Sequence, residues 1–255
     1  MRLAEIAFPK ESETKPPLIV AHGLFGAARN WRAHAKRMGP DRRVIAVDMR
    51  NHGESAWDDD MSYAAMAGDL AETIEAHGAR AAVMGHSMGG KAAMVLALTR
   101  PELVERLIVA DIAPVAYGHD LMNEIEAMRG VDLTGLERRS EVEAALEAKV
   151  ADRATRAFLA HSAELGGEPR WSLNLDALAA DMDRITGFPE MEGAFGGRTF
   201  FLLGGASKYV QAAHRETVLR LFPNASYEAI KDAGHWLHAD KPREFLDAAN
   251  RFLES

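Results

Sequence analysis

Residues 85–89 read Gly-His-Ser-Met-Gly, which sets a serine midway between two glycines. An apolar run, 81–84, precedes these residues and a helix-forming run, 91–98, follows them, so the pattern is strand, sharp turn and helix. The absence of side-chain bulk at both glycines permits a strained backbone at the serine. The N-terminus of the following helix favours negative charge nearby. The segment therefore predicts that Ser87 is a nucleophile.

A serine hydroxyl is a weak nucleophile until a base takes its proton, and the chain has ten histidines to choose from. We favour His235, because it lies between the last predicted strand and the last predicted helix, in a loop expected at the same sheet edge as the serine. His22 and His86 flank tight glycine turns and are expected to make structural hydrogen bonds. His52 and His238 remain alternative pocket residues. The other five are expected near helices and at the surface: His34, His77, His119, His161 and His214.

The base in turn needs a carboxylate that orients it. Asp111 directly follows the apolar run 107–110, on the loop beside the nucleophile strand, and we predict that it is this acid. Asp48 also ends a predicted strand, but the segment 48–55 is typical of a structural turn. Asp232 and Asp240 flank the histidine loop and are expected to cap local backbone. The predicted order of serine, aspartate and histidine matches that of one known hydrolase architecture.

Acyl transfer also requires hydrogen-bond donors for the oxyanion of the tetrahedral intermediate. We predict that the backbone N–H of Met88, directly after the nucleophile, is one donor. The second is expected from the loop 22–26, His-Gly-Leu-Phe-Gly, where the Leu24 N–H is the natural choice. Phe25 and Trp236 adjoin these loops and are expected to contact substrate.

The elements that must position these residues are short apolar strands that alternate with helices. In the first half, the strands are expected at 18–21, 44–47, 81–84 and 107–110, and helices at 30–38 and 62–77. After a break, strands are expected at 199–203 and 226–230, and helices at 209–221 and 242–253. This alternation predicts an α/β fold with a mainly parallel sheet, covered by helices on both faces.

The alternation of strands and helices stops between 115 and 191, where the sequence contains helix signals and no convincing strand. Residues 140–143, Ser-Glu-Val-Glu, resemble a capping box, and Asp152 and Asn174 are candidate N-caps. A helical insertion between two halves of one sheet is most simply a cap over its carboxyl edge. We therefore predict a core formed by 1–114 and 192–255 and a helical cap at 115–191.

Composition narrows the classes of function. The 255 residues carry a net charge of −8 without a Lys/Arg block, which argues against nucleic acid and anionic membranes as partners. The absence of cysteine excludes disulfides and thiolate nucleophiles and suits the cytoplasm. No apolar run is long enough to span a membrane. His and carboxylate spacing does not suggest a metal. The oligomeric state is not indicated.

Five segments together resemble the α/β-hydrolase superfamily: His-Gly-Leu-Phe-Gly, Asp-Met-Arg-Asn-His-Gly-Glu-Ser, Gly-His-Ser-Met-Gly-Gly-Lys, Asp-Ile-Ala-Pro and Ala-Gly-His-Trp. The combination is most similar to small bacterial YbfF-type esterases and abhydrolase-domain 11 proteins. In that subgroup the acid follows the strand before the cap, as Asp111 does. A serine, here Ser207, occupies the position where other branches carry the acid. It is expected either near substrate, His235 or Asp111, or as a simple loop serine. The resemblance implies cofactor-free hydrolysis of a small acyl ester or thioester, including acyl-CoA, through an acyl-enzyme.

Three alternatives share these residues. The same fold and triad serve C–C bond hydrolysis and cofactor-free perhydrolysis. Some proteins of this fold bind ligands without catalysis, although an intact triad and both oxyanion loops argue against that class here. Haloalkane dehalogenase and epoxide hydrolase chemistry is disfavoured, because those enzymes use an aspartate where this chain has Ser87.

Overall fold

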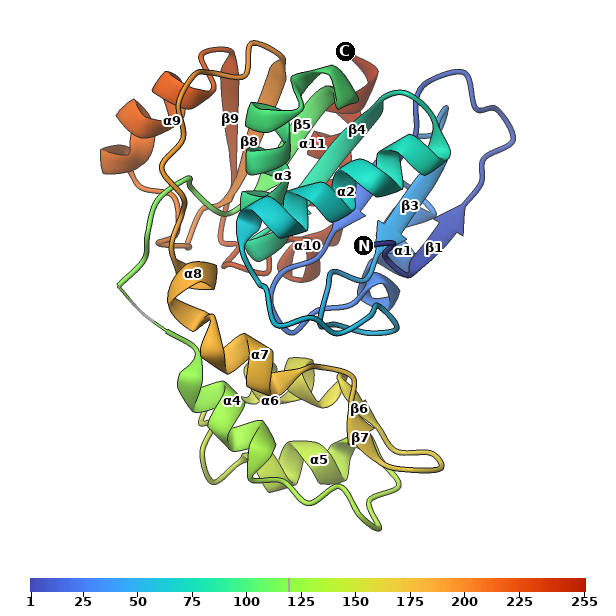
Figure 1. Cartoon of the computed structure of the whole chain (residues 1–255), viewed down its shortest axis with the longest axis vertical. Coiled ribbons are helices and arrows are strands. Elements are labelled where there is room, and N and C mark those ends of the chain that lie inside the picture. The colour runs from blue at the N-terminus through green and yellow to red at the C-terminus, as the bar shows by residue number, and fades with distance from the viewer. Residues whose placement is uncertain (119) are drawn as a thin grey trace.

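The computed structural model describes residues 1–118 and 120–255. Its centre is a seven-stranded sheet in the order β1-β3-β2-β4-β5-β8-β9 (Figure 1). The edge strand β1 is antiparallel to β3, and the other neighbouring strands are parallel. The strands are β1 (Glu5–Phe8), β2 (Leu18–Ala21), β3 (Val44–Val47), β4 (Ala81–His86), β5 (Val104–Ala110), β8 (Arg198–Gly204) and β9 (Ala225–Ile230). The predicted mainly parallel α/β sheet is confirmed; β1, whose residues are all exposed or half-buried, was not predicted.

Helices cover both faces of the sheet, and successive strand residues face opposite layers. In β2, for example, Ile19 and Ala21 belong to one buried cluster, and Leu18 and Val20 belong to the other. The first cluster contains residues of α2 (Tyr63–His77), α3 (Met88–Thr99) and α9 (Arg215–Leu221). The second contains residues of α1 (Arg32–Ala35), α10 (Leu237–Asp240) and α11 (Pro242–Glu254). Three short 3-10 helices are also present in the described residues: η1 (Ala28–Trp31), η2 (Pro101–Leu103) and η3 (Ala212–His214).

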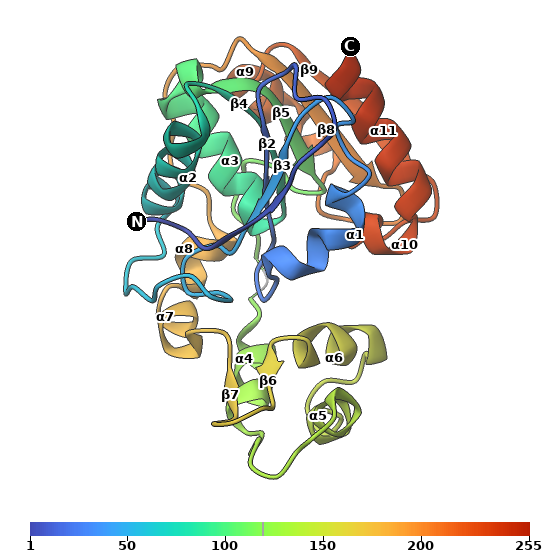
Figure 2. The same cartoon turned by 90° about the vertical axis from the view of Figure 1, so that its right-hand side faces the viewer.

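The chain between β5 and β8 forms a largely helical group that projects from the sheet (Figures 1 and 2). Its elements are α4 (Met122–Arg129), α5 (Arg139–Leu146), α6 (Arg153–Ala160), β6 (Ala163–Glu164), β7 (Arg170–Trp171), α7 (Leu175–Ala180) and α8 (Met182–Thr186). The expectation that this interval lacks strands was wrong, since β6 and β7 pair as a small antiparallel hairpin. Two residues per strand are too few to produce a periodic pattern.

Two other details of this group differ from the predictions. The helix α5 begins at Arg139, so Ser140 lies inside its first turn; the N-terminal contact is made by the Glu141 carboxylate, which accepts the Arg138 N–H at 2.9 Å. The single helix expected after Asn174 is two helices, because Asp181 leaves the helical conformation between them (φ −107°, ψ 18°). Asn174 and Asp152 do cap their helices as predicted.

Candidate active site

Ser87 lies at the junction of β4 and α3 in a strained backbone conformation. Its φ of 52° and ψ of −119° fall in a region that residues with side chains rarely adopt. The two flanking glycines are required by close backbone contacts: a Cβ at Gly85 would lie 2.2 Å from the Gly89 carbonyl oxygen, and one at Gly89 would lie 2.5 Å from the Ala21 carbonyl oxygen. The turn therefore presents the Ser87 side chain at the end of the strand.

His235 and Asp111 meet at this edge of the sheet. His235 Nδ1 donates to Asp111 Oδ2 at 2.8 Å, and the Asp111 side chain is fully buried. The other carboxylate oxygen accepts the Gly204 N–H at 2.9 Å, which fixes the plane of the carboxylate. Asp111 itself follows β5 with a φ of 51°, a second strained backbone at the same edge. This contact leaves the imidazole Nε2 free to act as a base.

Ser87 and His235 line the same cavity, whose volume is about 390 Å³. Within the described residues no direct hydrogen bond joins the two side chains; such bonds often shorten only when substrate is bound. The cavity size lies within the range of small-molecule sites. Phe25 and Trp236 line it, together with Thr155, Phe158 and Leu159 of α6.

Ser207 does not line this cavity. Its hydroxyl donates to Asp111 Oδ2 at 2.5 Å and accepts the Tyr209 N–H at 3.2 Å. One carboxylate oxygen of Asp111 thus receives hydrogen bonds from both Ser207 and His235.

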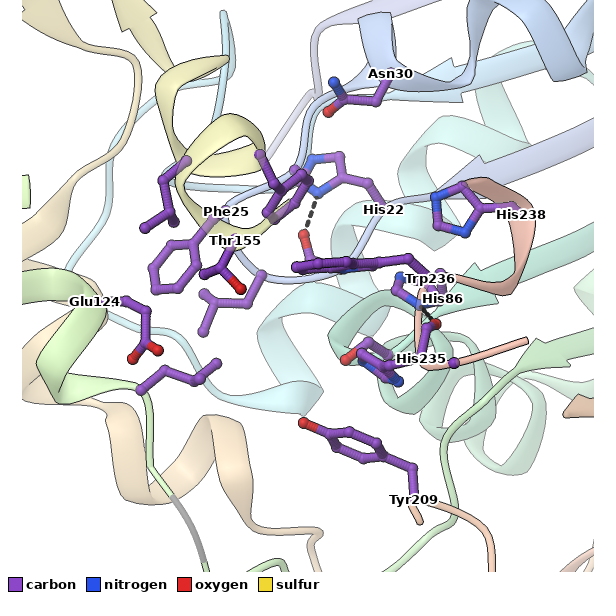
Figure 3. Close-up of a pocket in the computed structure, with 18 of the residues that line it drawn as sticks. His22, Phe25, Asn30, His86, Glu124, Thr155, Tyr209, His235, Trp236 and His238 are labelled. Atoms are coloured by element: carbon purple, nitrogen blue, oxygen red, sulfur yellow. Dashed lines mark hydrogen bonds between the residues drawn. The ribbon is translucent and has the colours of Figure 1, made fainter. Parts of the chain in front are cut away.

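Two residues that the sequence did not assign to the site hold His235 from either side (Figure 3). The Tyr209 ring stacks on the imidazole at a centroid distance of 3.8 Å and an interplanar angle of 20°. The His86 Nε2–H donates to the His235 carbonyl oxygen at 2.8 Å. The sequence predicts a helix that begins at Tyr209, whereas the first helical residue of this segment is Ala212. The place of Tyr209 two residues after Ser207, in a loop at the carboxyl edge, is the signal that points to the site. His86 makes a structural hydrogen bond, as expected.

The loop after β2 forms a tight turn closed by the Gly26 N–H donating to the Gly23 carbonyl oxygen at 3.0 Å. Phe25 occupies the third position of this turn with a φ of 64°, where glycine or asparagine is usual. Among the described residues, the N–H groups of Leu24 and Met88 donate to no protein atom. Both residues border Ser87 in a second cavity of about 40 Å³. Two unpaired donors beside a serine are the arrangement that an oxyanion site requires.

Buried, uncharged histidines lie beside the same loop. His22 Nε2 accepts the Met49 N–H at 2.9 Å, and its Nδ1–H donates to the Gly23 carbonyl oxygen at 2.8 Å. Burial lowers the pKa of His22 to about 4 and that of His52 to about 3. Burial also lowers the pKa of His238, which lines the large cavity, to about 3. Each of these imidazoles is therefore uncharged at neutral pH.

We expect this cluster of histidines to make the fold sensitive to mild acid. In the unfolded chain these imidazoles bind protons below about pH 6.5, whereas the folded protein resists protonating His22 until about pH 4 and His52 and His238 until about pH 3. The contribution of these histidines to the free energy of unfolding is therefore fully present above pH 6.5. It falls as the pH decreases, by up to about 1.4 kcal/mol per pH unit for each histidine. Urea unfolding at pH 7.5, 6.0 and 5.0 measures this loss. An unchanged free energy of unfolding from pH 7.5 to 5.0 would show that the imidazoles are not held neutral.

The other candidate residues have structural contacts. Asp48 holds the turn expected of it, accepting the Ala28 N–H at 2.6 Å and the Glu54 N–H at 3.0 Å. Asp240 accepts the Gly234 N–H at 2.7 Å and so caps the histidine loop. His34 is not at the surface as expected: it is half-buried, and its Nε2 contacts the His238 carbonyl oxygen at 2.9 Å, because α1 packs against α10. His119 lies outside the described residues.

Within residues 1–118 and 120–255, no three His, Asp or Glu side chains converge in an arrangement that would hold a metal ion. No helix in the same ranges combines the length and apolar character needed to cross a bilayer.

The chain was compared with known proteins. Residues 16–242 match the family model described as alpha/beta hydrolase fold. The chain is 43% identical to the mouse sn-1-specific diacylglycerol lipase ABHD11, over 94% of this chain and 81% of the relative. It is 36% identical to the esterase YbfF of Escherichia coli, over 93% of this chain and 92% of the relative.

A solved structure described as a marine microorganism esterase superposes with a TM-score of 0.91 and 34% identity, covering 98% of this chain and 99% of the other. The family match spans the Ser87 turn, Asp111 and the His235 loop, and the structural match extends over the inserted helices as well. The protein therefore belongs to the α/β-hydrolase fold family and is similar to the YbfF-type esterases within it.

Proposed function

We propose that this protein is a serine hydrolase of carboxylic esters or acyl thioesters, and that Ser87, His235 and Asp111 form its triad. The observation that carries the proposal is the buried Asp111 carboxylate bound to His235 Nδ1 at 2.8 Å, with His235 and Ser87 lining one cavity. A carboxylate in this position keeps the proton on Nδ1 and leaves Nε2 to accept the serine proton. The esterase and lipase names of the relatives support an ester as the substrate.

In the proposed mechanism, the Ser87 oxygen forms a bond to the substrate carbonyl carbon while its proton passes to His235 Nε2. The carbonyl oxygen becomes an oxyanion and accepts hydrogen bonds from the Leu24 and Met88 N–H groups. The tetrahedral intermediate expels the alcohol or thiol, which takes the proton from Nε2, and leaves an acyl-enzyme on Ser87. Water, deprotonated by the same imidazole, then releases the carboxylic acid and regenerates the serine. No cofactor enters this sequence of steps.

We further propose that residues 115–191 form a cap that determines which substrates enter. Phe158 and Leu159 of α6 share the large cavity with Phe25 and Trp236 of the core, and the rings of Phe158 and Trp236 lie 5.2 Å apart. Substrate contact is assigned to Phe25 and Trp236. Ser207 is assigned a supporting contact to the triad aspartate and not a contact with substrate, because its hydroxyl binds Asp111. A small acyl compound is the expected partner, and a cytoplasmic location remains a prediction.

A substrate panel with active-site titration tests this proposal. We expect turnover of p-nitrophenyl esters or acyl-CoA thioesters, with one equivalent of fluorophosphonate abolishing it. Vinylogous diketones test C–C bond hydrolysis, and ester with added hydrogen peroxide tests perhydrolysis. Turnover of diketones alone would favour the C–C alternative. Binding of esters without turnover, or fluorophosphonate labelling of less than a tenth of the protein, would favour a non-catalytic ligand-binding protein.

A further inference from the structure

Phe25 follows Leu24 in the strained turn, and both its backbone N–H and its carbonyl oxygen are hydrogen-bonded. The Phe25 N–H donates to His52 Nε2 at 3.2 Å, and the Phe25 carbonyl oxygen accepts the Ser162 hydroxyl at 3.0 Å. Both partners are buried, His52 completely and Ser162 with only 3% of its surface exposed. A bulky residue at positive φ persists only where its surroundings fix it, and these two contacts fix Phe25.

Ser162 reaches this turn from the inserted segment, two residues after the end of α6. Its backbone is locked in turn by Ser172, whose N–H and hydroxyl donate to the Ser162 carbonyl oxygen at 2.8 and 3.0 Å. The Ser172 carbonyl oxygen also accepts the Gly53 N–H at 2.8 Å, next to a backbone bridge between His52 and Leu173. The segment that holds Phe25 through Ser162 is therefore the same one that pairs with the loop of His52.

We infer that Ser162 is a positioning residue for the oxyanion site and that the inserted segment, by docking on the core, fixes the Leu24 donor. Phe25 follows Leu24 directly in a four-residue turn, so a change in the orientation of the Phe25 peptide tilts the Leu24 N–H as well. The proposed function requires this N–H to point at the developing oxyanion, and donor geometry matters more there than in the ground state. This inference rests on the proposed function.

The Ser162→Ala variant tests the inference. We expect kcat to fall about 10-fold, less than for the loss of a donor outright, with KM within about twofold of wild type, because the donor is misaligned and not removed. Affinity for a boronic acid, which forms a tetrahedral adduct with the serine, should fall by the same factor as kcat/KM. Affinity for the carboxylic acid product should remain unchanged. Ser162→Cys, which keeps the size and a weak donor, should lie between the two.

Thr73→Val is the matched control, since Thr73 is also buried and its hydroxyl donates to a backbone carbonyl, that of Asp69, at 3.0 Å, in α2. It should lower the melting temperature without changing kcat or boronate affinity. Wild-type kcat and boronate affinity in a folded Ser162→Ala would overturn the inference, as would equal losses of kcat in both variants. If the wild-type protein hydrolyses no ester or thioester, the proposed function itself fails, which is a distinguishable outcome.

Discussion

Replacing Ser87 with alanine should reduce kcat by a factor of about 10⁶, the order of the loss seen when a serine protease loses its nucleophile. The loss is this large because no other group in the described cavity replaces the serine oxygen at the end of β4, between the Leu24 and Met88 donors. Substrate binding should persist, since the apolar walls from Phe25 and Trp236 are unchanged. Steady-state kinetics with the best ester of the panel, together with product-inhibition constants, measures both quantities.

The fold should tolerate this substitution. Alanine removes one oxygen, and no hydrogen bond within the described residues depends on the Ser87 hydroxyl, so the melting temperature should stay within a few degrees of wild type. Glycine at position 85 or 89 is different, because any added Cβ meets backbone at 2.2 or 2.5 Å. Residual activity above about one per cent in Ser87→Ala would mean that another residue carries the chemistry.

Replacing Asp111 with asparagine should lower kcat by about 10⁴ while preserving the shape of the site. Because the Gly204 N–H continues to require an acceptor, the asparagine oxygen takes the place of Oδ1 and its NH₂ group faces Ser207 and His235. A donor opposite His235 Nδ1 forces the imidazole into the tautomer with its proton on Nε2. That tautomer lacks a lone pair for the serine proton.

Asp232→Asn is the control for this experiment. Asp232 is a carboxylate only three residues before His235, but the His235 Nδ1 hydrogen bond goes to Asp111, so kcat should stay within about twofold of wild type. A mild effect of Asp111→Asn with a large effect of Asp232→Asn would reassign the acid. Circular dichroism of both variants establishes that the comparison is made on folded protein.

The fold could be predicted from sequence wherever a local pattern determined the structure. The buried strands of the parallel sheet appear as continuous apolar runs, and the helix expected at 62–77 is α2, with Ser62 as its N-cap. The assignments of Ser87, Asp111 and His235 follow from the predicted sheet, because each residue lies in the segment that leaves a predicted strand at the same edge. For these residues the topology of the sheet brings together groups that lie far apart in the chain.

Other parts of the site depend on contacts that no local pattern encodes. Ser162 reaches Phe25 across 137 positions of sequence, and only the docking of the inserted segment creates that contact. Tyr209 stacks on His235 because of the loop that follows β8, where the sequence indicated the beginning of a helix. The conformation of Phe25 at positive φ was also beyond prediction, since an aromatic residue there contradicts the usual turn preference.

The assignment of Ser87 as the nucleophile is tested most directly by mass spectrometry of the protein after reaction with a fluorophosphonate. The expected result is one adduct per chain, located on Ser87 by peptide mapping, appearing in proportion to the loss of ester hydrolysis and absent from Ser87→Ala. An adduct on a different residue, or full hydrolytic activity after Ser87 has been completely modified, would contradict the account.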